Sequence, residues 1–399
     1  MTGVTGDIYY DPYDFEIDNN PYPIWKRMRD DMPLYRNDRY GFFAVSRFAD
    51  VEACSANWQT FISGKGTVLE MIRSDLTIPR GMFIFEDPPI HGLHRGLMSR
   101  VFTPRRVSAL EARIREFCAR ALDPFVGSGG FDYVRDLGAD MPMRVISEML
   151  GIPEADQEVV RDRIDAQLRI DTGDAPRGTD SASLLSDRSQ FVEYINFRRE
   201  HPSDDLMTDL ITITFVDDHG VERHLDEEEI VNYATLLAAA GNETTTRLIG
   251  WTGYLLAKYP EERALLLNDR RLIPGAIEEI LRYEAPSPVQ GRFVTRDVEF
   301  YGTTVPEGSV LLLLTASANR DDRKFENPDR FDVRRKIDHH VTFGYGLHFC
   351  LGAALARLEG RVALEEVLAR FPTWEVDEEH AERVHTSTVR GWHRLPVRV

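Results

Sequence analysis

The chain has 399 residues, of which 42% are hydrophobic and 29% are charged, and its 66 acidic and 48 basic residues give a net charge of −18. This charge disfavours nucleic acid and anionic membranes as partners, and no run of about 18 apolar residues could span a membrane. The length alone would allow two or three domains.

The first half of the chain predicts a short strand followed by helices. The acidic, aromatic N-terminus has neither the basic nor the apolar region of a signal peptide, so we expect none. Residues 42–46 predict a strand, whereas residues 63–85 show no clear periodicity. Residues 104–160 predict helices with glycine-containing breaks. The polar segment 172–181 predicts a loop between two helices that could act as a lid.

The second half contains the longest predicted helix, over residues 226–257. Asp226 and Glu229 have the spacing of a capping box at its start. The segment is apolar on most sides, as expected for a helix that crosses the interior. Further helices are expected over 274–284 and 351–370, with short strands at 293–294, 298–301 and 310–314. The sequence therefore predicts a mainly α protein with minor β structure.

Cys350 lies in the most informative run of the chain, Phe-Gly-Tyr-Gly-Leu-His-Phe-Cys-Leu-Gly over 343–352. Gly346 and Gly352 would let the backbone pass close to a flat macrocycle. The helix start that follows offers free N–H groups, which favour a thiolate over a thiol. A thiolate is a ligand for haem iron that promotes O–O cleavage. The alternative is that Cys350 is a small buried hydrophobe.

This run resembles the haem-binding loop of the cytochrome P450 superfamily, at Phe343, Gly346, His348, Cys350 and Gly352. The resemblance implies one domain over 1–399, with the triangular, largely helical fold and small β-sheets of that family. It also implies haem b with Cys350 as the thiolate ligand to the iron. Without a Cys-x-x-Cys-His motif, the haem would be held non-covalently.

The centre of the long helix contains residues that are unfavourable for a regular helix. Gly241 costs about 1 kcal/mol relative to alanine, and the hydroxyl of Thr244 can bond back to a carbonyl four residues earlier. The family has an acid–threonine pair here, so the resemblance assigns proton transfer to bound oxygen to Glu243 and Thr244. The alternative is a bent core helix with a solvated Glu243.

Glu279 and Arg282 are three residues apart on one helix face, which by itself indicates a surface ion pair of little energetic weight. Their spacing resembles the family's Glu-x-x-Arg motif, and the run Asn-Pro-Asp-Arg-Phe over 327–331 resembles its Pro-x-Arg-Phe segment. The resemblance implies a buried structural network of Glu279, Arg282 and Arg330 that supports the haem loop.

His91 and Arg95 are four residues apart after the two prolines of the run Asp-Pro-Pro over 87–89. Alone they indicate a basic helix face. The family uses such a pair to bind a haem propionate, and Arg292 and His348 match its other propionate contacts. The neighbouring His94 has no assigned role.

The resemblance implies a soluble bacterial-type monooxygenase that takes O₂ and hydroxylates a small hydrophobic substrate. No flavin or iron–sulfur motif is present, so electrons would come from a separate ferredoxin and its reductase. Three distant cysteines form no disulfide framework, which favours the cytoplasm, and we expect a monomer. A basic docking patch is expected at Arg100, Arg105, Arg106, Arg357 and Arg361.

Two alternatives remain, a peroxide-driven hydroxylase and a haem-thiolate sensor without turnover. The acid–threonine pair argues against both. Reduced nicotinamide consumed with product formed would separate enzyme from sensor.

Mostly apolar residues near these motifs indicate a terpenoid, fatty-acid or steroid-like substrate, although each could be plain core. Arg390 is the charged residue nearby, and it could meet a carboxylate or point to solvent. The candidate pocket residues are Leu69, Ile72, Met82, Phe83, Leu236, Leu237, Ala240, Val289, Thr388 and Val389.

Overall fold

The computed structural model describes residues 8–157 and 190–399, so the predicted loop at 172–181 lies outside the described residues. Helices dominate and the sheets are small, as predicted. Within this part of the chain, no helix is long and apolar enough to cross a lipid bilayer.

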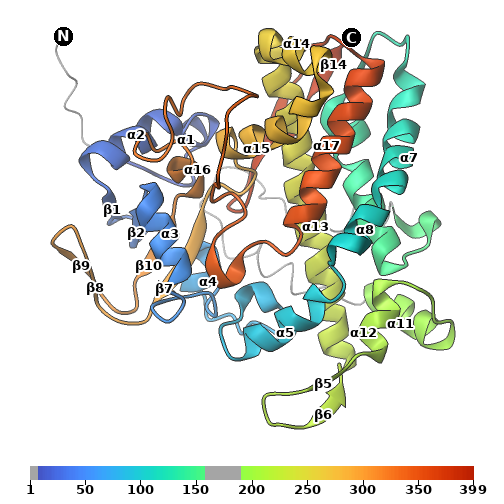
Figure 1. Ribbon diagram of the computed structural model, residues 1–399. Helices are drawn as coiled ribbons and strands as arrows, with labels where there is room; N and C mark the ends of the chain where they lie inside the picture. The colour runs from blue at the N-terminus through green and yellow to red at the C-terminus, as the bar shows by residue number, and fades with distance from the viewer. Residues whose placement is uncertain (1–7, 158–189) are drawn as a thin grey trace, which may run out of the picture.

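Most of the longer helices gather on one side of the molecule, beside the long α13 (Figure 1). The helices are α1 (Phe15–Asn19), α2 (Tyr22–Asp31), α3 (Phe48–Ala56), α4 (Leu69–Arg73), α5 (Ile90–Ser99), α6 (Pro104–Ala109), α7 (Glu111–Leu122), α8 (Asp140–Leu150), α11 (Gln190–Glu200), α12 (Leu206–Thr212), α13 (Glu227–Lys258), α14 (Pro260–Asn268), α15 (Ile273–Tyr283), α16 (Thr315–Ala318) and α17 (Ala353–Arg370).

The main sheet lies on the other side of the molecule, with strand order β1-β2-β10-β7-β3 (Figure 1). Its β2 and β10 are parallel and the other neighbours are antiparallel. The strands are β1 (Leu34–Asn37), β2 (Phe42–Val45), β3 (Phe61–Ile62), β4 (Gly130–Asp132), β5 (Thr214–Val216), β6 (Glu222–His224), β7 (Gln290–Val294), β8 (Val298–Phe300), β9 (Thr303–Val305), β10 (Val310–Leu313), β11 (Glu375–Val376), β12 (Glu382–His385), β13 (Arg390–Arg394) and β14 (Pro396–Arg398).

Helix α13 confirms the predicted long helix and crosses the interior. The Asp226 carboxylate accepts a hydrogen bond from the Glu229 N–H at 2.8 Å, and the Glu229 side chain accepts one from the Asp226 N–H at 3.0 Å, which completes the capping box. Tyr233 and Ala238 are fully buried. The helix contacts α8, α11, α15 and α17, and these contacts hold the residues at its centre in place.

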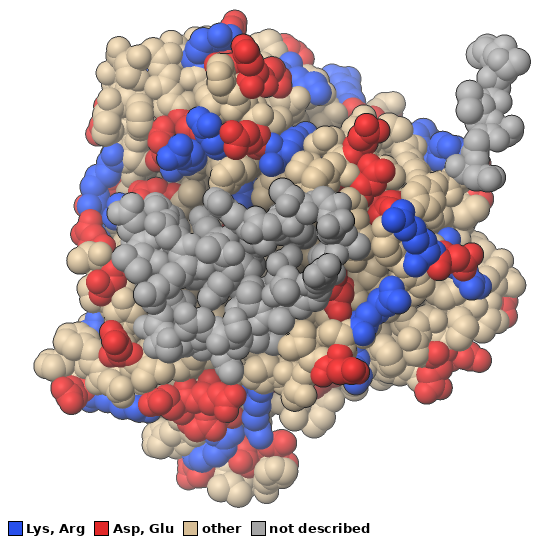
Figure 2. Space-filling view, turned by 180° about the vertical axis from the view of Figure 1, so that it is seen from behind, with Lys and Arg blue, Asp and Glu red and all other residues tan. Residues whose placement is uncertain are grey.

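The charges on the surface are mixed. Figure 2 shows basic and acidic side chains in adjacent groups on one face, with no broad basic area among the described residues there. Acidic and basic side chains therefore lie next to each other on this face, in keeping with a chain that carries 66 acidic and 48 basic residues.

Candidate active site

The segment that carries Cys350 is a tight loop directly before α17. The Cys350 N–H donates to the Phe343 carbonyl at 2.8 Å, which closes the loop. Gly346 has φ +72°, and a Cβ there would lie 3.0 Å from the Ser55 carbonyl oxygen, so only glycine fits this turn without displacing the backbone of α3. The structure thus holds the cysteine at a fixed place.

The residue Cys350 is exposed, whereas Cys54 and Cys118 are buried. It nevertheless lies deep in the protein, so that burial raises its pKa. The Gly352 N–H hydrogen-bonds to the sulfur, and Arg95 and Arg357 add positive charge; all three lower the pKa of the thiol. The position combines access to the sulfur with groups that stabilise a thiolate.

Apolar and small residues are exposed near the middle of the structure. Leu347 is 36% and Phe349 40% exposed beside Cys350. Ala240 is exposed on α13 between buried neighbours, and Thr244 one turn later is half-buried. Because α13 crosses the interior and the residues on either side of Ala240 are more buried, the exposure of Ala240 marks a place where other side chains do not cover this helix.

His91 and His348 place unsatisfied ring nitrogens together. His91 is 1% exposed and neither of its ring nitrogens has a hydrogen-bond partner; the Nε2 of His348 is buried and equally unpartnered. The two ring centroids are 4.3 Å apart. Burial, followed by the positive potential of His91, Arg292 and Arg95, lowers the pKa of His348 to about 3.

Arg292 and Arg95 complete this donor group. Arg292 is 4% exposed, and burial lowers its pKa to about 10. Arg95 donates to the Phe349 carbonyl, and its pKa is lowered by burial and raised by the nearby Cys350. Histidine nitrogens without a partner, the buried guanidinium of Arg292 and the half-buried Arg95 form the donor set that a haem with two propionates would satisfy. The residues present therefore fit this group.

At the centre of α13, Thr244 makes the hydrogen bond that its position predicts. Its Oγ1 donates to the Ala240 carbonyl at 3.0 Å. Glu243 is 7% exposed, with one carboxylate oxygen 3.7 Å from the guanidinium of Arg247. The alternative of a solvated Glu243 is therefore wrong, since this carboxyl is buried beside the half-buried Thr244.

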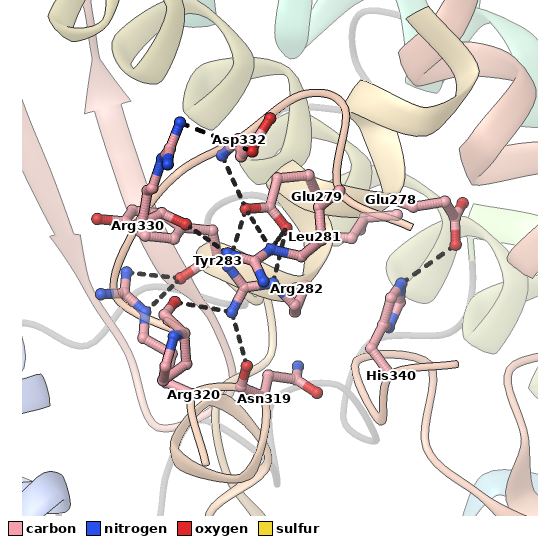
Figure 3. Close-up of polar contacts among 12 residues, drawn as sticks. Glu278, Glu279, Leu281, Arg282, Tyr283, Asn319, Arg320, Arg330, Asp332 and His340 are labelled. Atoms are coloured by element: carbon pink, nitrogen blue, oxygen red, sulfur yellow. Dashed lines mark hydrogen bonds and ion pairs between the residues drawn. The ribbon is translucent and has the colours of Figure 1, made fainter. Parts of the chain in front are cut away.

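The Glu279–Arg282 pair is fully buried and bidentate, at 2.7 and 2.8 Å (Figure 3). Arg282 also donates to the carbonyls of Asn319 and Pro328, both at 2.9 Å. These bonds fix α15 to the chain segment that leads to the Cys350 loop. The reading of this pair as a surface ion pair is wrong.

The contact predicted for Arg330 is wrong. Its side chain is 64% exposed and turns toward Asp332 (Figure 3), while Arg335 reaches Glu279 at 3.2 Å. Arg335 also donates to the carbonyls of Glu326, Asn327 and Arg330. The third member of the network is therefore Arg335, five residues after the expected one.

Two further residues of this support could not be assigned from the sequence. The Asn319 side chain accepts from the Val341 N–H at 2.9 Å and donates to Thr342 at 2.8 Å, and Thr342 donates to the Leu281 carbonyl. They tie the start of the Cys350 loop to α15. Nothing in the local sequence around Asn319 marks it, since its partners are distant in the chain.

The candidate pocket residues fall into separate groups. Met82, Phe83, Leu236 and Leu237 share one buried cluster. In contrast, Leu69, Ile72 and Val289 pack in another cluster, under the main sheet, with Tyr10 and Trp25. Leu69 and Val289 also line a cleft with Thr67, Pro288, Thr386 and Ser387.

Of the remaining candidates, Ala240 is exposed on α13, and Thr388 and Val389 directly follow Ser387 in the chain. Val389 is 3% exposed, and the Thr388 carbonyl accepts a hydrogen bond from Ser287 at 2.9 Å. Arg390 meets a carboxylate of the protein itself, Glu284, and is buried, so it is a structural residue.

The basic patch is partly neutralised. Arg106 pairs with Asp209, Arg357 with Glu278, and Arg361 with Glu111. Arg100 and Arg105 are exposed, and no ion pair of theirs occurs within residues 8–157 and 190–399. Among the described residues, the charges of Arg100 and Arg105 are therefore not offset by an acidic partner, in contrast to those of the other three arginines.

Glu359 of α17 is a buried carboxyl that no motif identified. It is 2% exposed, and burial raises its pKa well above 4.5 despite a hydrogen bond with Thr245. A carboxyl whose folded pKa is raised stabilises the protein fully below its unfolded pKa, and this contribution is lost as the pH rises toward the folded pKa.

The variant Glu359→Gln has no carboxyl at this position, so we expect it not to show this decrease in stability as the pH rises. The difference in free energy of unfolding, variant minus parent, should increase from pH 5 to pH 8. The increase is about 1.4 kcal/mol for each pH unit that lies between the unfolded and folded pKa values of Glu359. Urea unfolding at the two pH values measures this. The exposed Glu375→Gln serves as control, and an equal pH dependence of Glu359→Gln and parent would contradict a neutral buried carboxyl.

Comparison with known proteins agrees with this geometry. The family model described as cytochrome P450 matches residues 187–396. A putative cytochrome P450 123 of Mycobacterium tuberculosis is 39% identical over 100% of this chain and 99% of its own, and a vitamin D(3) 25-hydroxylase of Pseudonocardia autotrophica is 35% identical over 98% and 97%. The structure of CYP109Q5 from Chondromyces apiculatus has a TM-score of 0.86 at 33% identity, covering 98% of this chain and 97% of that one, which confirms the predicted fold.

Proposed function

The chain belongs to the cytochrome P450 family, whose members are haem-thiolate monooxygenases, and on this premise we propose that Cys350 is its thiolate ligand and that it hydroxylates a small hydrophobic substrate. The observation that carries the proposal is that Cys350 is exposed and that the Gly352 N–H hydrogen-bonds to its sulfur. When bound, the haem supplies the activation of O₂.

The protein's own residues have three tasks around this cofactor. His91, Arg95, Arg292 and His348 hold the two propionates, as their unsatisfied or desolvated donor groups support. The loop residues Phe343, Gly346 and Gly352 fix the sulfur and its hydrogen-bond donor. Glu279, Arg282 and Arg335 hold the segment that leads into the loop.

The proton path of the proposal runs through α13. Glu243 would take a proton from the solvent side, and the Thr244 hydroxyl would donate a hydrogen bond toward the side of α13 that faces the cofactor. The support is their adjacency, with Glu243 almost buried and Thr244 half-buried beside the exposed Ala240.

For the substrate we propose a terpenoid, fatty-acid or steroid-like molecule. The apolar group of Met82, Phe83, Leu236 and Leu237 supports this class, and the similarity to a vitamin D(3) 25-hydroxylase favours a steroid-like molecule. Visible titration of the ferric protein with such compounds tests it, since a substrate that displaces a water ligand gives a blue-shifted Soret band. Absence of that shift with all three classes would contradict the assignment.

We propose a ferredoxin with its reductase as the electron source, and a monomer in the cytoplasm. Arg100 and Arg105 supply the positive charge for docking an acidic partner. Size-exclusion chromatography tests whether the protein is a monomer. Reduction kinetics at increasing salt test the docking of ferredoxin, because docking by charge weakens as salt is added.

Thr244→Ala is expected to uncouple oxygen use from product formation. Without the hydroxyl, product per NADPH should fall about tenfold, equivalent to about 1.4 kcal/mol, while hydrogen peroxide rises. Product, NADPH, O₂ and peroxide are measured together with any compound that gives the blue shift.

The matched control is Thr252→Ala, two turns further along α13. Thr252 donates to the Leu248 carbonyl at 2.9 Å, the same backbone bond that Thr244 makes. Coupling should stay normal in this control. Unchanged coupling in Thr244→Ala, or an equal loss in both variants, would contradict the proton path.

A further inference from the structure

The side chain of Glu86 closes a short loop back on itself. The Gly81 N–H donates to Glu86 Oε1 at 2.9 Å. The same carboxylate meets Nδ1 of His94 at 2.7 and 2.9 Å, and His94 is fully buried on α5. One carboxylate therefore shapes the segment 81–86 and attaches it to α5. None of the motifs that identified the family includes this pair.

The opposite side of the segment lies against α13. Gly81 has φ +92°, and a Cβ there would lie 3.4 Å from the Glu229 carbonyl oxygen. The Asn232 side chain donates to the Arg80 carbonyl at 2.7 Å. The segment is thus held between α5 and α13 by polar contacts at both edges.

Met82 and Phe83 lie within this held segment. Both are buried, and the Phe83 ring lies 6.0 Å from that of Tyr233. Tyr233 in turn packs edge-on against His94, at 5.8 Å between centroids. Leu236 and Leu237, one turn further along α13, belong to the same apolar cluster. The position of Met82 and Phe83 hence depends on the pair that anchors their loop.

The Glu86 backbone also contacts the candidate cofactor site. His348 of the Cys350 loop hydrogen-bonds to it, and His94 directly precedes Arg95 on α5. Glu86 therefore connects three elements: the loop that carries Cys350, helix α5, and the segment with the apolar pocket residues.

We propose that Glu86 and His94 are positioning residues that fix the pocket wall formed by Met82 and Phe83 and thereby set which large ligands fit. This inference rests on the proposed function, because it takes that cluster to be the substrate side of the site. A large ligand would lose affinity without the pair, since its binding would then have to order the segment. A small ligand at the iron would not contact the wall.

Two iron-binding probes of different size test this with the haem-loaded protein. Imidazole and 4-phenylimidazole are titrated by the Soret shift against the parent, His94→Phe, Glu86→Gln and His94→Asn. We expect His94→Phe to weaken 4-phenylimidazole binding at least tenfold and imidazole less than twofold. Glu86→Gln should follow in the same direction, and His94→Asn, which keeps a side-chain N–H donor, should stay within threefold of the parent.

Equal changes for both probes, or no change for either in a folded variant, would overturn the positioning role. If His94→Phe does not yield haem-loaded protein, Glu86→Gln and hydrogen exchange of the parent decide. The Gly81 amide should be protected in the parent, and free exchange of this amide would refute the anchor. Failure of both probes to shift the parent spectrum would instead count against the proposed function itself.

Discussion

Cys350→Ser is expected to abolish oxygenation while leaving a folded protein. A serine hydroxyl at this position stays neutral and cannot replace a thiolate that donates electron density to the iron. The hydrogen bond from the Gly352 N–H lowers the pKa of the Cys350 thiol, but it would not turn a serine hydroxyl into an anion. We expect product formation to fall at least about 10³-fold, equivalent to about 4 kcal/mol, with loss of the red-shifted Soret band of the reduced carbon monoxide complex.

The other two cysteines provide the controls for this variant. Cys54 and Cys118 are buried in apolar clusters, and burial raises the pKa of both thiols. Cys54→Ala and Cys118→Ala should therefore keep the red-shifted band and lose only stability. A Cys350→Ser protein that kept this band would show that another residue ligates the iron.

Arg335→Leu is expected to prevent accumulation of haem-loaded protein, whereas Arg330→Leu should have little effect. Removing Arg335 leaves the buried Glu279 with one guanidinium partner in place of two and frees three backbone carbonyls. Loss of one partner from a buried charge network costs about 3 kcal/mol, a large part of the roughly 5–15 kcal/mol of a typical domain.

Arg330 and Arg335 lie five residues apart on one segment, so Arg330→Leu is a matched control for Arg335→Leu. Arg330 is largely exposed and only 3.9 Å from Asp332, so its loss should change stability by less than about 0.5 kcal/mol. The yield of haem-loaded protein and the urea midpoint are measured for both. A larger effect for Arg330→Leu would contradict the network as the structure has it.

The elements that periodicity and capping define locally could be predicted from the sequence. Helix α13 was expected over 226–257 because its cap and its apolar pattern lie in one continuous segment, and it spans Glu227–Lys258. The main-sheet strands β2 and β10 were likewise marked by short apolar runs. The expectation of a single domain stays a prediction.

Features that depend on the path of the backbone between elements could not be predicted. Arg330 follows Asn327, whose φ is +46°, and its N–H is bonded to the Asn327 carbonyl. This turn directs Arg330 outward and brings Arg335 to Glu279. The local motif alone does not show which of the two arginines reaches Glu279. Nearness to motifs in the sequence groups Leu69 and Val289 with Met82, but the fold places them in a different cluster.

In the proposed function, this chain places one atom of O₂ on a hydrophobic substrate. The most direct test incubates the purified protein with a bacterial ferredoxin, its reductase, NADPH and ¹⁸O₂, using a compound that gives the blue-shifted Soret band. We expect NADPH consumption that depends on the compound, and a product carrying one ¹⁸O atom. Binding of the compound with no oxygenated product, or product formed only when peroxide replaces NADPH, would contradict it.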